Sequence, residues 1–282
     1  MRCATGWGSD MRIADWDDAY ANRDHIHGAA QYIDRWPVAA RAFRDGLASA
    51  GRARLDHAYG PAPRQRLDLF APDGAARGLV VFVHGGYWMA FDKSVWSGFA
   101  AGAVAAGWAV AVPSYTLAPA ARIAEMTREI AAAVAEAARL VPGPVRAAGH
   151  SAGGHLVARL TCADSTLAPA VRDRLAHVVP ISGLHDLRPL LRTAMNATLG
   201  LDPVAAAAES PALLTPREGV RVTTWVGGDE RPEFLRQSAL LANVWTGLGA
   251  DMASVVDPGT HHFSVIDGLG SADSALTRCL LG

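Results

Sequence analysis

The sequence has little cysteine, almost no net charge and no long apolar run. Its 282 residues include three cysteines, Cys3, Cys162 and Cys279, which are odd in number and far apart. Because no CxxC pair occurs, a zinc site or disulfide framework is not expected, and the thiols fit a reducing compartment. The formal net charge of −1 gives no electrostatic footprint for nucleic acid or an anionic membrane. A small molecule is therefore the expected partner.

No stretch approaches the roughly 18 uninterrupted apolar residues that a membrane span requires. Asp10, Asp15, Asp17 and Asp18 stand where a signal peptide would have an apolar run. We therefore expect no membrane association and a cytoplasmic location. The oligomeric state is left open by these features, with a homodimer as one alternative.

Half of the residues are apolar, which is enough for a large buried core. Residues 11–50 have a helical, amphipathic pattern and precede the first strand signal. We therefore predict an N-terminal helical cap segment at residues 1–60 and the main α/β domain at residues 61–282. The two together are expected to form one structural domain.

The strand signals alternate with helical ones. Residues 65–71 alternate between apolar and polar, which is typical of a half-buried outer strand. Continuous apolar runs, typical of strands covered on both faces, follow at 79–83, 108–112, 145–148, 178–181, 220–226 and 252–256. Helical patterns between these runs predict an α/β fold with a mostly parallel sheet flanked by helices. Residues 187–216 interrupt the alternation and are expected to form an insertion over the site.

Residues 149–153 read Gly-His-Ser-Ala-Gly, a G-x-S-x-G pattern centred on Ser151. The pattern follows the predicted strand at 145–148 and precedes a helical stretch at 155–160, the context of a nucleophile elbow. Such a turn projects the serine hydroxyl above the sheet, and the helix N-terminus behind it favours developing negative charge. An ordinary glycine-rich turn can carry the same five letters, but the context favours Ser151 as a nucleophile.

Residues 84–88, His-Gly-Gly-Tyr-Trp, follow the apolar run at 79–83. Consecutive glycines let backbone N–H groups face a ligand, as an oxyanion hole requires. Three residues are expected to supply those N–H groups: Gly86, Tyr87 and Ala152. Three neighbours are assigned to substrate binding: Gly85, Trp88 and His150. His84 is expected to be structural and to bond the loop backbone.

A catalytic triad needs an acid and then a base downstream of the serine. Asp229 and Glu230 follow the predicted strand at 220–226, and His261 and His262 follow the last predicted strand. Open α/β sheets assemble their ligand sites at such strand ends. Spacing alone does not distinguish the two members of either pair.

These motifs resemble the arylformamidase (kynurenine formamidase) branch of the α/β-hydrolases, which is related to the hormone-sensitive-lipase-like esterases. Residues 84–88, 112–119, 149–156, 181–187, 231–238 and 262–266 carry the resemblance. It implies the α/β-hydrolase fold, with residues 61–282 as the catalytic domain. It also implies Ser151 as nucleophile, His262 as base and Glu230 as acid. Because formamidases carry aspartate at the acid position, Glu230 is a departure and Asp229 stays a rival.

The resemblance implies a serine hydrolase that uses an acyl-enzyme on small aryl formamides or short-chain carboxylic esters. That chemistry requires neither a metal ion nor an organic cofactor. Bulk at Tyr87 and Trp88 is expected to narrow the acyl side of the pocket. The alternatives are a general carboxylesterase of the hormone-sensitive-lipase-like type and a non-catalytic binding module, whose hallmark would be a broken triad.

Overall fold

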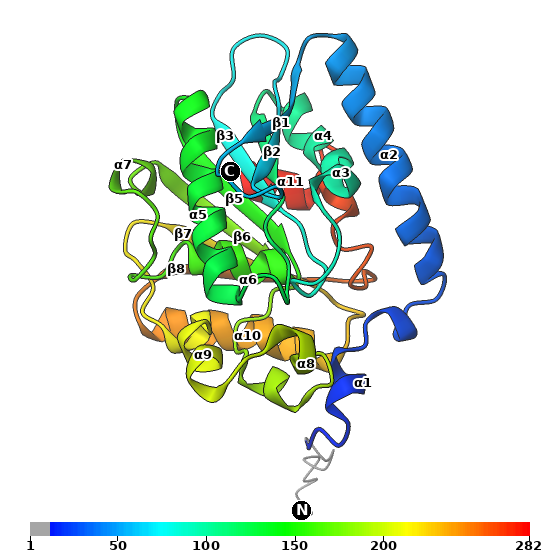
Figure 1. The fold of residues 1–282 in the computed structure, drawn as a ribbon, viewed down its shortest axis with the longest axis vertical. Helices are drawn as coiled ribbons and strands as arrows, with labels where there is room; N and C mark the ends of the chain where they lie inside the picture. The colour runs from blue at the N-terminus through cyan, green and yellow to red at the C-terminus, as the bar shows by residue number, and fades with distance from the viewer. Residues whose placement is uncertain (1–11) are drawn as a thin grey trace, which may run out of the picture.

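The computed structural model describes residues 12–282, and Cys3 and Asp10 lie outside this range. An eight-stranded sheet forms its centre, in the order β1-β2-β4-β3-β5-β6-β7-β8 (Figure 1). The strands are β1 (Ala53–Ala58), β2 (Arg66–Phe70), β3 (Leu79–Val83), β4 (Ala109–Pro113), β5 (Val145–His150), β6 (Leu175–Ile181), β7 (Arg221–Gly227) and β8 (Asp251–Asp257). β2 pairs antiparallel with both β1 and β4, and every other pair in the sheet is parallel. The predicted fold class is confirmed.

Helices cover both faces of this sheet (Figure 1). One face carries α5 (Ile123–Leu140), α6 (Ala152–Arg159) and α10 (Pro232–Gly247); the other carries α2 (Ala29–Ser49), α3 (Lys93–Trp96), α4 (Ala101–Ala105) and α11 (Ala275–Leu281). Short helices complete the fold: α1 (Trp16–Tyr20), η1 (Arg23–His25), η2 (Ser97–Ala100), α7 (Pro169–Arg172), η3 (Arg188–Arg192), α8 (Asn196–Leu199), α9 (Pro203–Ala208), η4 (Pro211–Leu213) and η5 (Asp267–Gly270).

The double cover explains the continuous apolar runs in the sequence. In β3, Val81 and Val83 belong to the hydrophobic cluster on the α5 face, while Val80 and Phe82 belong to the cluster on the α2 face. All five residues of β3 are buried. A strand in this position needs an apolar side chain at every residue, because both faces lack water.

Two strands at the sheet edges differ from the sequence-based expectation. β1 was not predicted, because most of its residues are exposed and its sequence, ARLDHA, lacks an apolar run. β8 was expected to be covered on both faces, but it is an edge strand without a fully buried residue, and Val256 is 56% exposed. The apolar run at residues 252–256 therefore predicted the strand correctly, but the prediction that both of its faces are covered is wrong.

The predicted N-terminal helical segment is present as α1, η1 and α2. Trp36 of α2 packs against Trp96 at the end of α3, with ring centroids 4.9 Å apart. α1 lies against α10 and η3 at the opposite end of this segment (Figure 1). Residues 187–216 form short helices, as their irregular pattern indicated. Among the helices of residues 12–282, none is both long enough and apolar enough to cross a membrane.

Candidate active site

Ser151 stands at the sharp turn between β5 and α6. Its backbone has φ 56° and ψ −116°, an unusual conformation for a residue other than glycine, and its N–H donates to the carbonyl of Ile181 at 2.8 Å. A Cβ at Gly153 would lie 2.0 Å from the carbonyl oxygen of Val83, so only glycine allows α6 to start this close to β3. The predicted strand–turn–helix context is therefore the local structure around Ser151.

Glu230 and His262 form a buried pair at the ends of neighbouring strands. Glu230 follows β7, His262 follows β8, and the Nδ1 of His262 lies 2.6 Å from the Oε2 of Glu230. The side chain of Glu230 is fully shielded from solvent and that of His262 is 4% exposed. Because the carboxylate accepts at Nδ1, the Nε2 of a neutral His262 is left as a proton acceptor.

The rival members of the two pairs have other surroundings. Asp229 lines a hollow of about 260 Å³ whose wall also includes Glu230 and His262, and no hydrogen bond joins its carboxylate to His262 among residues 12–282. The Nδ1 of His261 accepts from the backbone N–H groups of Phe263 (3.2 Å) and Ser264 (3.3 Å). The carboxylate that is hydrogen-bonded to the Nδ1 of His262 is that of Glu230.

A cavity of about 460 Å³ contains both Ser151 and His262 in its wall. Much of the wall is aromatic or otherwise apolar: Ile33, Trp36, Tyr87, Met89, Phe91, Trp96, Met195 and Phe263. The N-terminal segment contributes one side of this wall, from Asp17 to Trp36, and the insertion at residues 187–216 contributes Met195. This cavity can accommodate an aromatic small molecule next to the serine.

The loop after β3 reaches the same cavity with Gly86 and Tyr87. Three successive residues of this loop, Gly86, Tyr87 and Trp88, have positive φ angles of 111°, 49° and 57°. Burial raises the pKa of Tyr87, so its hydroxyl stays protonated and donates to the carbonyl oxygen of Tyr20 at 2.5 Å. Ala152 is fully buried at the start of α6.

Two residues assigned to substrate binding lie elsewhere. Trp88 does not line the cavity: its side chain is fully buried, and its ring meets that of His155 edge-on at 5.2 Å. Gly85 packs under the elbow, where an added Cβ would lie 2.8 Å from the carbonyl oxygen of His150. Both residues therefore pack against the loop and the elbow and do not line the cavity. His150, the third assigned residue, does line the cavity.

Burial favours the neutral form of His150 and of His84. The Nε2 of His150 donates to the backbone carbonyl of His262, and burial lowers the pKa of His150 well below its usual value. His84 donates from Nδ1 to the carbonyl of Gly85 at 2.8 Å, the loop-bonding role expected for it, and burial lowers its pKa to about 4. Within residues 12–282, no three His, Cys, Asp or Glu side chains are grouped as metal ligands.

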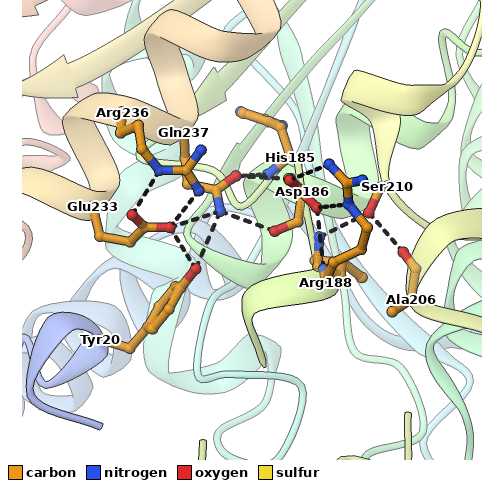
Figure 2. A network of polar contacts seen from close by, with 10 residues as sticks. Tyr20, His185, Asp186, Arg188, Ala206, Ser210, Glu233, Arg236 and Gln237 are labelled. Carbon is orange, nitrogen blue, oxygen red and sulfur yellow. Dashed lines mark hydrogen bonds and ion pairs between the residues drawn. The ribbon is translucent and has the colours of Figure 1, made fainter. Parts of the chain in front are cut away.

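The sequence alone did not identify Tyr20 and Asn22 as site residues. Tyr20 accepts the bond from Tyr87 at its carbonyl, and its own hydroxyl donates to Glu233 of α10 at 2.6 Å (Figure 2). The Nδ2 of Asn22 donates to the hydroxyl of Tyr87 at 3.4 Å. These contacts join residues 65 and more positions apart, so no local pattern could have indicated them.

Comparison with known proteins agrees with this architecture. The BD-FAE family model matches residues 67–197, from β2 into α8. Kynurenine formamidase of Danio rerio is 27% identical over 244 residues, which is 83% of this chain and 82% of the fish protein. Kynurenine formamidase of Salmo salar is 28% identical over 259 residues, covering 85% of this chain and 86% of that protein.

A solved structure has a higher identity. The crystal structure of a candidate thioesterase from Silicibacter sp. TM1040 is 50% identical in sequence, with a TM-score of 0.91. The match covers 95% of this chain and 99% of the Silicibacter chain. Identity at this level over nearly the whole length means that the two proteins share one family and one fold. The chain belongs to the α/β-hydrolases, in their arylformamidase-like branch.

Proposed function

We propose that this protein is a serine hydrolase that works through an acyl-enzyme, with Ser151 as nucleophile, His262 as base and Glu230 as acid. The proposal is supported most directly by one cavity whose wall includes both Ser151 and His262. The Nδ1 of His262 is in turn hydrogen-bonded to the buried carboxylate of Glu230 at 2.6 Å. A nucleophile, a base and a group that orients the base are the parts that acyl transfer requires.

In the first half-reaction, Ser151 Oγ attacks the substrate carbonyl carbon while the Nε2 of neutral His262 takes the hydroxyl proton. The carboxylate of Glu230 holds the imidazole tautomer and stabilises the imidazolium that forms. The N–H groups of Gly86, Tyr87 and Ala152 bind the oxyanion of the tetrahedral intermediate. When this intermediate collapses, the bond to the leaving group breaks, and the leaving group takes the proton from His262.

In the second half-reaction, water replaces the leaving group. His262 removes a proton from the water, whose oxygen attacks the acyl carbon. The bond to Ser151 Oγ then breaks, the acid product leaves, and Ser151 regains its proton from His262. The neutral state of buried His150 supports this scheme, because a second cation beside His262 would oppose formation of the imidazolium.

The aromatic wall supports an aryl group as the leaving group, because offset and edge-on ring contacts with Trp36, Tyr87 or Phe263 would hold it. The kynurenine formamidases among its relatives support a small aryl formamide. Short-chain carboxylic esters use the same steps and are included in the proposal. A general carboxylesterase is the alternative, and the Silicibacter relative adds thioesters to the substrates worth testing.

Steady-state kinetics tests the proposal on aryl formamides and on p-nitrophenyl esters of formyl, acetyl, butyryl and octanoyl groups, with one acetyl thioester. We expect kcat/KM to be highest for formyl or acetyl and to fall steadily with chain length. Each methylene changes discrimination by only about 1–3 kcal/mol, so the preference is graded. Of the two aromatic residues expected to narrow the acyl side of the pocket, Tyr87 lines the cavity and Trp88 does not.

Three other outcomes would change the assignment. A preference for octanoyl esters would replace the formamidase proposal by the general carboxylesterase. Selective turnover of the thioester would favour the activity for which the Silicibacter relative is named. No turnover of any substrate, in protein that is folded, would favour the non-catalytic binding module.

A further inference from the structure

The carboxylate of Glu230 is held by more than His262. Its Oε2 accepts from the Nδ1 of His262 at 2.6 Å, and its Oε1 accepts from the backbone N–H of Gly227 at 2.9 Å. The hydroxyl of Ser182, at the end of β6, donates to the same Oε1 through a short hydrogen bond. Because the Glu230 side chain is fully shielded from solvent, these donors replace the water that would otherwise stabilise its charge.

We propose that Ser182 is a positioning residue that fixes the Glu230 carboxylate in the orientation that His262 requires. The proposal rests on the proposed function, since it assigns Ser182 to the acid of that triad. Ser182 does not line the substrate cavity and is fully buried, so it acts through Glu230 and not on the substrate.

The length of the acid is one reason why it needs this donor. Glutamate has one more rotatable bond than aspartate, and so it loses more freedom when its carboxylate is fixed. The bond to His262 holds Oε2, and the donors at Oε1 restrict the rotation of the carboxylate that this one bond leaves open. With Ser182 and Gly227 both donating to Oε1, the plane of the carboxylate is fixed before the reaction begins.

The backbone conformation of Ser182 supports the same role. Its φ is +50°, in the left-handed region where a side chain costs energy and glycine does not. Its N–H donates to the carbonyl of Trp225 in β7 at 2.7 Å, which holds the turn beside the strand that precedes Glu230. The hydroxyl group explains why serine, and not glycine, stands in this left-handed conformation, because glycine could not donate the bond to Glu230.

The loop that follows Ser182 is clamped to α10 by Gln237, as Figure 2 shows. The Oε1 of Gln237 accepts from the backbone N–H groups of His185 and Asp186, both at 2.7 Å. Its Nε2 donates to the carbonyl of Asp186 at 2.9 Å. Gln237 is fully buried, and so these bonds do not compete with water. These bonds hold the loop after Ser182 in place, so the hydroxyl of Ser182 has a fixed position from which to hold Glu230.

Ser182→Ala tests the proposal, with Ser238→Ala as the matched control. Ser238 is also a buried serine, but its hydroxyl has no hydrogen-bond partner among residues 12–282, and it lies on α10 outside the site. A hydrogen bond to a charged group is typically worth a factor of about 10 to 100. We expect Ser182→Ala to lower kcat by that factor with KM nearly unchanged, and Ser238→Ala to leave both constants close to wild type.

A double-mutant cycle with Glu230→Gln separates positioning from a merely structural role. If Ser182 acts through the carboxylate, then Ser182→Ala should cost little once that carboxylate is absent. An equal loss in both backgrounds, or wild-type kcat in Ser182→Ala, would overturn the positioning role while the serine-hydrolase proposal stood. Absence of turnover in the wild-type protein would instead overturn both.

Discussion

The imidazole of His150 donates its Nε2–H to the backbone carbonyl of His262, over 2.8 Å. A carbonyl can only accept, so the bond assigns the proton of His150 to Nε2. His150 directly precedes Ser151, and the rings of His150 and His262 have their centroids 4.6 Å apart. One hydrogen bond therefore ties the turn that carries the nucleophile to the loop that carries the base.

We expect His150→Phe to lower kcat about fivefold, because one hydrogen bond of roughly 1 kcal/mol that aligns the two loops is lost. Phenylalanine keeps an aromatic ring beside Trp96, whose centroid is 5.8 Å from that of His150. Steady-state kinetics measures the effect, and a thermal melt checks that the variant is folded. An unchanged kcat would show that this bond does not align the site.

The elbow and the central strands could be predicted because their causes are local. Ser151 lies between glycines that the turn requires, and β3 is apolar at every residue because helices cover both of its faces. The ends of the predicted strands also limited the acid to Asp229 or Glu230 and the base to His261 or His262. The spacing could not select one residue of each pair, because two adjacent residues after a strand differ mainly in the direction of their side chains.

Other parts of the site depend on tertiary contacts that no local pattern encodes. Tyr20 contacts Tyr87 and Glu233, and Ser182 contacts Glu230, although each pair is distant in sequence. Trp88 was assigned to the cavity from its place after two glycines. Its side chain is fully buried beside His155 instead, in a loop of three positive φ angles that could not be deduced from the sequence.

Glu230→Gln should lower kcat by several orders of magnitude, because an amide no longer selects the reactive tautomer of His262 or stabilises its cation. Asp229→Asn should change kcat less than about threefold, since Asp229 does not line the cavity that contains Ser151 and its backbone N–H bond to Thr260 survives the substitution. Paired kinetics on the two variants decides the matter. A larger loss in Asp229→Asn than in Glu230→Gln would reverse the assignment of the acid.

His262→Ala should remove nearly all turnover, whereas His261→Ala should retain most of it. The ring of His261 accepts two backbone N–H groups of its own turn and packs on Tyr32 at 5.0 Å. Its loss should therefore lower the melting temperature more than it lowers kcat. Measurement of kcat and of the melting temperature for His262→Ala and His261→Ala tests this expectation. Equally severe losses of kcat in the two variants would contradict it.

The free energy of unfolding should fall as the pH is lowered from 6.5 towards 4. Burial lowers the pKa of His84 and His177 to about 4, and of His155 and His185 to about 3, from 6.5. Between these values the unfolded chain binds protons that the native protein does not, so acid favours unfolding. Each histidine contributes up to about 1.4 kcal/mol per pH unit. Urea unfolding at pH 7 and pH 5 should differ by several kcal/mol.

His185→Leu provides an internal check on that pH dependence. Both ring nitrogens of His185 are buried without a hydrogen-bond partner among residues 12–282. Leucine has a similar size and does not titrate, so the variant should lose up to about 1.4 kcal/mol per pH unit of the slope. A slope identical to that of the wild-type protein would mean that His185 does not contribute.

The mass of the protein after treatment with a fluorophosphonate tests whether Ser151 is the nucleophile. We expect a single covalent adduct that peptide mapping assigns to Ser151, with turnover lost in step with labelling. Ser151→Ala should take up no label and should lose at least about 10³-fold in kcat, as expected when a triad member is removed. An adduct on another residue, or a Ser151→Ala variant with more than about a tenth of wild-type activity, would rule out Ser151 as the nucleophile.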